Sequence, residues 1–247
     1  MGRPDWASFR TAPVSVAHPA GSHVGTLALD ANPPAPHRIA TEELANALTH
    51  GAGALLGLAG MSVLVHTSLR YSVATHTAAV LLYGLSLVSV FTASTLYHAT
   101  ALSRWNALFG VIDRSCIFAL IAGTYTPFAV TALSGPGRTA LLGSIWLMCA
   151  VGTAACGLAR FRTRTRSIAL YLLAALPAAV VVHLVHPLPS LLGPGGAALV
   201  VGGGVCYSIG IAFYVRRAAY AHTMWHLCVL AGSGLHYFGV LLYATPK

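Results

Sequence analysis

Two histidines four residues apart, in the sequence HTMWH from His222 to His226, form the first pattern in this chain that could do chemistry. In a helix of 3.6 residues per turn they lie about 40° apart, so both imidazoles can reach one ion from one face. Alone, the spacing is a weak signal, because it also fits two histidines at a membrane boundary and lacks the internal glutamate of HExxH proteases. The elements that position these residues must decide between the two interpretations.

The composition indicates whether this chain folds in water or in a membrane. Hydrophobic residues make up 56% of it and charged residues only 8%, and the mean hydropathy is +0.73, whereas soluble domains carry about 25% charged residues. The sequence therefore predicts an integral, multi-pass protein of the cell membrane. The net charge of +9 does not indicate nucleic-acid binding, because the arginines stand in short clusters between apolar runs and form no basic domain.

Seven apolar segments follow a polar, proline-rich stretch, and each is near the roughly 20 residues that a helix needs to cross a bilayer. We expect residues 1–40 to be a disordered cytoplasmic tail and residues 41–247 to form an all-α, seven-transmembrane helix bundle. The expected helix cores are Leu44–Leu69, His76–Tyr97, Ala107–Leu133, Thr139–Leu158, Ser167–Val185, Gly196–Val215 and Thr223–Thr245.

The basic residues predict the orientation of the seven segments, since short cytoplasmic loops are enriched in Lys and Arg. Ten basic residues fall on the side of the N-terminus: Arg3, Arg10, Arg38, Arg104, Arg160, Arg162, Arg164, Arg166, Arg216 and Arg217. The other side has only Arg70, Arg138 and Lys247, when Arg114 inside the third segment is left out. This asymmetry places the N-terminus in the cytoplasm and the C-terminus outside.

With this topology, polar residues of three segments reach the same leaflet. The second segment ends with Ser94 and His98, the third begins with Asp113, and the seventh begins with His222 and His226. Neutral imidazoles are common zinc ligands, and a catalytic zinc has three protein ligands and an open fourth position. We therefore predict a Zn²⁺ site near the cytoplasmic leaflet in which His98, His222 and His226 are the ligands.

Asp113 is the only acidic residue after Glu43. A charged side chain in hydrocarbon costs at least about 2.5 to 3.5 kcal/mol on insertion scales, so we expect it to face the bundle interior. A carboxylate beside zinc can accept a proton from water whose pKa the metal lowers to roughly 7, and hydroxide could then attack a carbonyl. The plainer alternatives are an ion pair with Arg114 and a residue that extends to the boundary.

Four ordered motifs resemble the hemolysin III family, within the superfamily of progestin and adiponectin receptors and alkaline ceramidases. They are EELANALTHGAGALLGLAG in the first segment, STLYH at the end of the second, VIDRSCIFALIAGTYTPF in the third and HTMWHLCVLAGSGLHYF in the seventh. The resemblance covers nearly everything from Thr41 to the end. It implies a seven-helix bundle with zinc near the cytoplasmic leaflet, and the family's site residues fall on Ser94, His98, Asp113, His222 and His226.

The resemblance leaves two classes of function open. The superfamily implies hydrolysis of an amide bond in a lipid such as ceramide, with Asp113 placing or deprotonating the zinc water and Ser94 hydrogen-bonding nearby. The alternative is a non-enzymatic sensor, regulator or lytic pore former with structural zinc. Three histidines plus water favour the hydrolase, whereas coordination by Asp113 would favour the structural metal. The sequence does not define the substrate beyond a membrane lipid, nor the oligomeric state.

Other histidines have plainer interpretations. His66, His76, His183 and His186 lie near the outer boundary, where loop or interfacial roles are expected. His50 could line the zinc site, and His236 could face a polar cavity or make an interhelical hydrogen bond. The 14-residue spacing of His222 and His236 also fits heme, but no second helix offers a matching pair. A retinal protein is disfavoured because the only lysine is the last residue.

Overall fold

The computed structural model describes residues 36–158, 171–172, 188–216 and 218–244. Six long helices make up nearly all of this part of the chain, and no strand occurs in it. The helices are α2 (Pro36–Leu69), α3 (Ala74–Ala99), α4 (Asn106–Ala132), α5 (Gly135–Gly157), α7 (Leu188–Val215) and α8 (Ala221–Tyr243). All six are long and apolar enough to cross a membrane. The all-helical prediction is therefore confirmed for the described residues.

The helices coincide with six of the seven predicted segments. The remaining segment, Ser167–Val185, lies outside the described residues except for Tyr171 and Leu172, which are helical. Most boundaries differ from the prediction by no more than four residues, but the starts of α2 and α7 differ by eight. Helix α2 begins at Pro36, so residues 36–40 are helical and do not belong to a disordered tail; proline is well suited to a first helical turn, where its missing N–H costs nothing.

Helix α7 begins at Leu188, eight residues before the predicted start. The turn signal in HPLPSLLGPGG is nevertheless visible as a kink inside the helix. Gly193 has φ 70° and ψ 170°, a conformation that side chains with a Cβ rarely adopt, and Pro194 follows it. The sequence LPSLL before the kink therefore forms a short helical stretch of its own, and the longer apolar stretch after it is the expected membrane segment.

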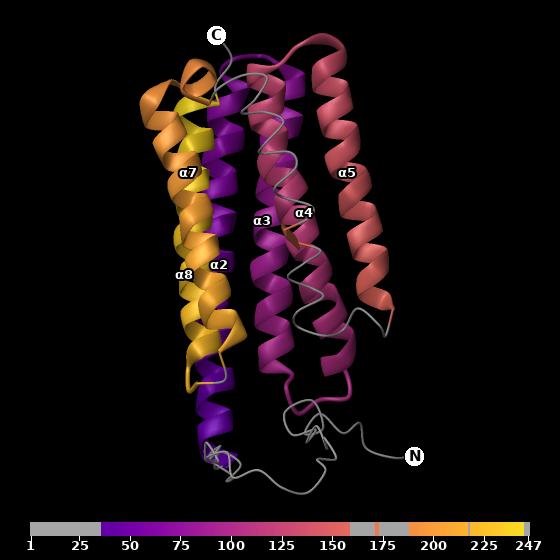
Figure 1. The fold of residues 1–247 in the computed structure, drawn as a ribbon, viewed down its shortest axis with the longest axis vertical. Coiled ribbons are helices and arrows are strands. Elements are labelled where there is room, and N and C mark those ends of the chain that lie inside the picture. The colour runs from indigo at the N-terminus through magenta and orange to yellow at the C-terminus, as the bar shows by residue number, and fades with distance from the viewer. Residues whose placement is uncertain (1–35, 159–170, 173–187, 217, 245–247) are drawn as a thin grey trace, which may run out of the picture.

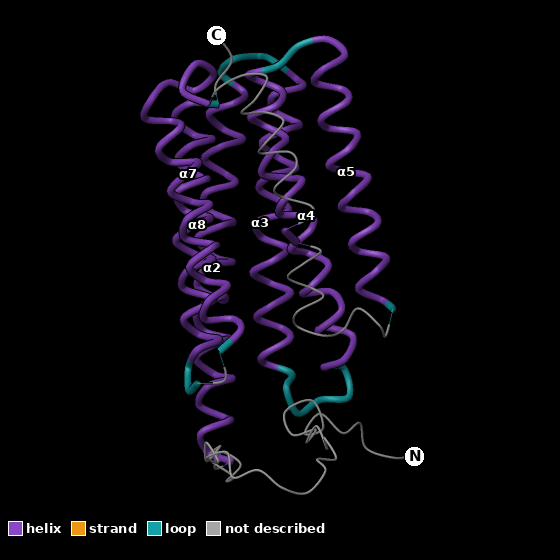
Figure 2. The backbone as a smooth tube through the Cα atoms, viewed as in Figure 1, coloured by secondary structure: helices purple, strands orange, loops and turns teal. Residues whose placement is uncertain are grey.

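The helices pack mainly against their neighbours in the chain, and each described helix runs opposite to the one before it except α7, which runs in the same direction as α5 (Figure 1). Helix α3 lies between α2 and α4, and α5 stands at the edge of the bundle next to α4. Helix α8 packs against α7 and also against α2, so the first and last described helices are in contact. The tube in Figure 2 shows short loops from α2 to α3, from α3 to α4 and from α4 to α5. Because the helices lie side by side, their termini gather at two ends of the bundle.

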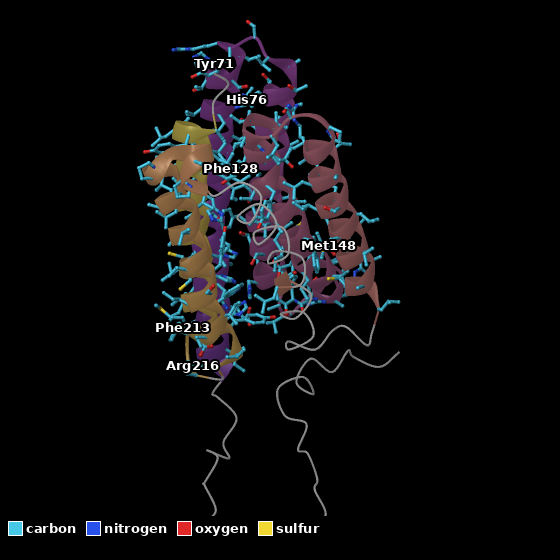
Figure 3. All side chains as sticks on the ribbon, turned by 45° about the horizontal axis from the view of Figure 1, so that its top comes forward. Tyr71, His76, Phe128, Met148, Phe213 and Arg216 are labelled. Carbon is cyan, nitrogen blue, oxygen red and sulfur yellow. The ribbon has the colours of Figure 1, made fainter. Side chains whose placement is uncertain are left out.

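We call one of these the histidine end; there α2, α4 and α8 begin and α3 ends. At the other, which we call the opposite end, α2, α4 and α8 finish and α3 begins. Figure 3 shows this separation, with Phe213 and Arg216 at one extremity of the bundle and Tyr71 and His76 at the other. The two ends are used below to locate each histidine.

The interior of the bundle is built from side chains of α2, α3, α4 and α8, including the fully buried Tyr83 and Val80. Small residues permit the close approach of neighbouring helices. A Cβ on Gly84 would collide with Met61 of α2, and one on Gly152 would collide with Phe118 of α4. Glycine at these two positions therefore permits the close packing of α2 on α3 and of α4 on α5.

Large apolar side chains cover much of the outer surface. Leu55 and Leu56 of α2 are 72% and 70% exposed, and Leu147 of α5 and Leu242 of α8 are more than half exposed. Soluble monomers rarely expose contiguous apolar surface of this extent. Together with the lengths of the helices, this surface supports a multi-pass membrane protein.

Candidate metal centre

Three histidines meet at the histidine end. His98 is in the last turn of α3, and His222 and His226 are in the first two turns of α8. One ring nitrogen of each lies within 4.8 Å of the others, so the group could hold a metal ion. His98 and His226 are buried and His222 is partly buried. The structure thus brings together the three residues that depth in the membrane predicts as ligands.

The His98 ring is fixed by a carboxylate from α2. Its Nδ1 lies 2.6 Å from Oε2 of Glu43. Because a carboxylate accepts hydrogen bonds, Nδ1–H is the donor and Nε2 carries the lone pair in the neutral ring. His98 Nε2 is buried and has no hydrogen-bond partner among the described residues. A buried acceptor with no protein partner is a group that a bound ion or water could satisfy.

The His226 ring is fixed from the same helix. Its Nδ1 lies 3.2 Å from the main-chain carbonyl oxygen of Asn46 and 3.3 Å from Oγ1 of Thr49. The carbonyl can only accept, so Nδ1–H donates to it and Nε2 is again the lone-pair nitrogen. The Thr223 hydroxyl donates to Oδ1 of Asn46 at 2.6 Å and joins α8 to α2 beside the site. Both orientations make Nε2 available to a metal.

His50 lies against this group. Its ring stacks on that of His226, with the centroids 3.6 Å apart and the planes 14° apart, and its edge contacts Phe91. His50 is only 3% exposed, and neither of its ring nitrogens has a hydrogen-bond partner in the described structure. The side chain thus lines the site from α2, as one interpretation of the sequence proposed.

Ser94 and Asp113 lie beside the histidines. Ser94 is buried one turn before His98 on α3, and its hydroxyl lies near the carboxylate of Asp113 on α4. Asp113 also interacts electrostatically with His98 and Arg114. Among the residues that the structure describes, Asp113 does not belong to the group whose ligand atoms lie within 4.8 Å of one another. Its carboxylate is therefore next to the centre without being one of its three closest donors.

The donor set fits a metal such as zinc. Zn–N bonds are roughly 2.0–2.1 Å long, so two nitrogens on one ion are at most about 4.2 Å apart. The three nitrogens lie within 4.8 Å of one another, and small side-chain rotations would bring them to that spacing. The carboxylate on Nδ1 of His98 is the kind of outer partner that orients a histidine ligand. Imidazoles also bind copper, iron and nickel, so the ligands do not identify the metal.

The other histidines of the described chain lie outside this centre. His236 sits deeper on α8 and its Nε2 is 3.0 Å from the Val200 carbonyl oxygen, which is the interhelical hydrogen bond expected as one of its roles. This bond occupies the nitrogen that a heme would need. His66 is exposed and contacts Arg70, four residues further along α2. His183 and His186 fall outside the described residues.

Sequence reasoning missed Glu43, Asn46 and Thr49 as parts of the site. Glu43, Asn46 and His50 are spaced three and four residues apart, which places them on one face of a helix. An acid, an amide and a histidine on one face of an apolar segment was a usable signal. Glu43 lies before the predicted helix core, and a charged residue at that position is usually interpreted as a boundary residue.

The helices, the apolar surface and the buried histidines define a class of protein, an α-helical membrane protein that could hold a metal between its helices. A family model described as Haemolysin-III related matches residues 38–237. The chain belongs to this family, and the resemblance inferred from the four motifs is confirmed. The matched range includes the whole candidate centre.

Individual relatives agree with this assignment. Hemolysin-3 of Bacillus cereus is 35% identical over 206 residues, which cover 83% of this chain and 93% of that protein. A Hemolysin-3 homolog of Bacillus subtilis (strain 168) is 33% identical over 205 residues, 83% of this chain and 95% of the homolog. The human protein Monocyte to macrophage differentiation factor is 28% identical over 174 residues, 67% and 71% of the two chains.

Proposed function

We propose that this hemolysin III family protein is a zinc-dependent hydrolase that cleaves a membrane lipid, either at an amide bond, as ceramidases do, or at an ester bond. The observation that carries the proposal is the difference in position between the three histidines and Asp113. Three histidines converge on one point, while Asp113 stands beside them outside the closest donor group. An open fourth position with a carboxylate at its side is the arrangement that catalytic zinc uses.

The chain's own residues suit hydrolysis. Zinc bound by three histidines would polarise a carbonyl oxygen and make water acidic enough to lose a proton near neutral pH. The Asp113 carboxylate would accept that proton as the water oxygen bonds to the carbonyl carbon, and it would return the proton to the leaving nitrogen or oxygen when the bond to carbon breaks. The Ser94 hydroxyl lies near Asp113, where it can donate a hydrogen bond that holds the carboxylate in place.

The position of the centre suits a lipid substrate. The three histidines are one or two turns inside helices that are long and apolar enough to span a bilayer, a depth near the headgroups. Arg104, between α3 and α4, and Arg216, after α7, are both at this end, whereas Arg70 and Arg138 are at the other. The distribution of basic residues supports a cytoplasmic N-terminus and a cytoplasmic-leaflet site in a seven-helix protein of the cell membrane.

Purified protein in detergent tests the proposal. Zinc content and lipid hydrolysis should be measured in the wild type, His226→Ala and Asp113→Asn, with His66→Ala as a matched loss of an exposed imidazole. The substrates should include ceramides and diacyl glycerophospholipids, to separate amide from ester cleavage. We expect about one zinc per chain except in His226→Ala, and hydrolysis only in the wild type and His66→Ala. Undiminished zinc in His226→Ala would show that His226 is not a ligand.

A structural metal is the second candidate, and one observation favours it. The ligands join α3 to α8, and their orienting groups come from α2, so a metal would tie together helices from both ends of the chain. Such a metal would serve a sensor, a regulator of membrane state or a lytic protein. Zinc bound by a wild type that cleaves no lipid in the panel would favour this function over hydrolysis.

A further inference from the structure

Helix α2 provides none of the three ligand nitrogens, yet it holds two of the three rings. Glu43 accepts from Nδ1 of His98 at 2.6 Å, and the carbonyl of Asn46, one turn later, lies 3.2 Å from Nδ1 of His226. Both contacts place the proton on Nδ1 and leave Nε2 as the donor toward the centre. The Asn46 contact is made by the main chain, whereas the Glu43 contact depends on one side chain.

The Glu43 contact is shielded and specific. The His98 side chain is 4% exposed and that of Glu43 is 19% exposed, so little water competes for the bond. The contact joins residues 55 positions apart, across the interface of α2 and α3. His98 Nε2, on the other side of the same ring, is buried and has no partner in the described part of the chain. The ring is therefore held at one nitrogen and available at the other.

We propose that Glu43 is a positioning residue of the metal centre, which sets the affinity for a divalent cation by holding Nδ1–H of His98 and directing Nε2 toward the ion. This inference rests on the metal site of the proposed function and is independent of whether the site hydrolyses lipid. A carboxylate on the outer nitrogen of a histidine ligand fixes its tautomer and increases its basicity, and loss of such a partner typically weakens metal binding 10- to 100-fold. Glu43 acts through His98 and needs no contact with the metal.

Variants at Glu43 test this role. Zinc affinity should be measured by competition with a chromophoric chelator, using the full chain in detergent. We expect Glu43→Ala to bind zinc about 10- to 100-fold more weakly than the wild type. Glu43→Gln keeps an oxygen that can accept from Nδ1–H but lacks the charge, so its loss should be smaller. Glu42→Ala removes the same charge from the adjacent residue and should bind within about twofold of the wild type.

A double-variant cycle separates positioning from a general effect on folding. If Glu43 acts through His98, then Glu43→Ala should cause no further loss of affinity in a His98→Ala background. The absorption bands of bound Co²⁺ provide a second measurement, and they should shift in Glu43→Ala and return toward the wild type in Glu43→Gln. Folding of each metal-free variant is checked by its thermal unfolding midpoint.

Two results would overturn the inference. One is wild-type affinity in Glu43→Ala, and the other is an equal loss from Glu43→Ala with and without His98. A wild type that binds no zinc or Co²⁺ would overturn this inference and the proposed hydrolase together. A wild type that binds zinc with the predicted Glu43 dependence but cleaves no lipid would overturn the hydrolase alone.

Discussion

Buried histidines differ between the two ends of the bundle in how many of their ring nitrogens have a hydrogen-bond partner. At the opposite end, His76 is 4% exposed and both of its nitrogens are bonded by the protein. Nδ1 is 2.7 Å from the Ser68 hydroxyl, and Nε2 is 2.6 Å from the carbonyl oxygen of Ala244. At the histidine end, His98 has one buried nitrogen without a partner among the described residues and His50 has two.

This difference distinguishes a structural histidine from a ligand-binding one. Leaving a buried polar group unpaired costs about 1–3 kcal/mol, so such groups in a native protein usually have a partner. His76 has its partners within the chain and fastens the start of α3 to α2 and to the end of α8. The histidine end contains three buried ring nitrogens without a partner among the described residues, one on His98 and two on His50, and a metal ion could bind the one on His98.

The largest effect is expected from the residue beside the metal. Asp113→Asn removes the proton acceptor but leaves all three histidines, so zinc should be retained while lipid hydrolysis falls about 10²- to 10⁴-fold. Zinc content and the initial rate of hydrolysis on the same preparation measure both quantities. Loss of zinc in Asp113→Asn would instead show that the aspartate is a fourth ligand, and the histidine end would then hold a four-ligand metal centre.

Removal of the metal should destabilise only those variants that keep the three histidines. At a free zinc concentration 100 times its dissociation constant, binding adds about 2.7 kcal/mol to the free energy of unfolding. A chelator should therefore lower the thermal unfolding midpoint of the wild type and of His66→Ala, and it should leave that of His226→Ala unchanged. An equal response in His226→Ala would place the stabilising metal elsewhere in the chain.

Truncation of His76 should weaken the bundle without affecting metal binding. His76→Ala removes two buried hydrogen bonds and is expected to cost about 1–3 kcal/mol of unfolding free energy. The cost is limited because Ala244 also accepts from Thr131 and Ser68 also contacts Thr77. Denaturant unfolding measures the loss, and chelator competition should give wild-type zinc affinity. A weakened affinity would mean that the two ends are coupled.

The smallest effect is expected at His50. His50→Phe keeps an aromatic ring beside His226 and removes two nitrogens that have no partner, so the metal-free protein should change in stability by less than about 1 kcal/mol in either direction. Thermal unfolding in the presence of chelator is the appropriate measurement. A loss of several kcal/mol would indicate that the His50 nitrogens already have partners in the metal-free protein.

The sequence predicted those features that depend on depth in the membrane. Apolar runs located six helices to within a few residues, apart from the starts of α2 and α7, and the same depth argument brought His98, His222 and His226 to one level. Hydropathy says little about which way a side chain faces around its helix. For this reason the bond from Glu43 to His98 and the stacking of His50 on His226 were not predicted.

His76 shows the same limitation at the other end. Its place in the first turn of α3 agrees with a histidine at the membrane boundary. Its partners could not be read from that position, because Ala244 is 168 residues away and bonds through its main-chain oxygen. Nothing about the side chain of an alanine indicates that its carbonyl will receive a histidine, so this contact requires knowledge of the helix packing.

The contact between α2 and α8 has a consequence for how the protein is made. Glu43 and Asn46 are translated near the start of the chain and His222 and His226 near its end; the contacts of Asn46 with the last helix span 177 and 180 positions. A nascent chain that stops before α8 has only one of the three ligands, and the orienting groups on α2 have no second ring to hold. Tight capture of a metal ion at this centre would therefore have to wait for the synthesis of α8, and a bound ion would report that α8 has joined α2 and α3.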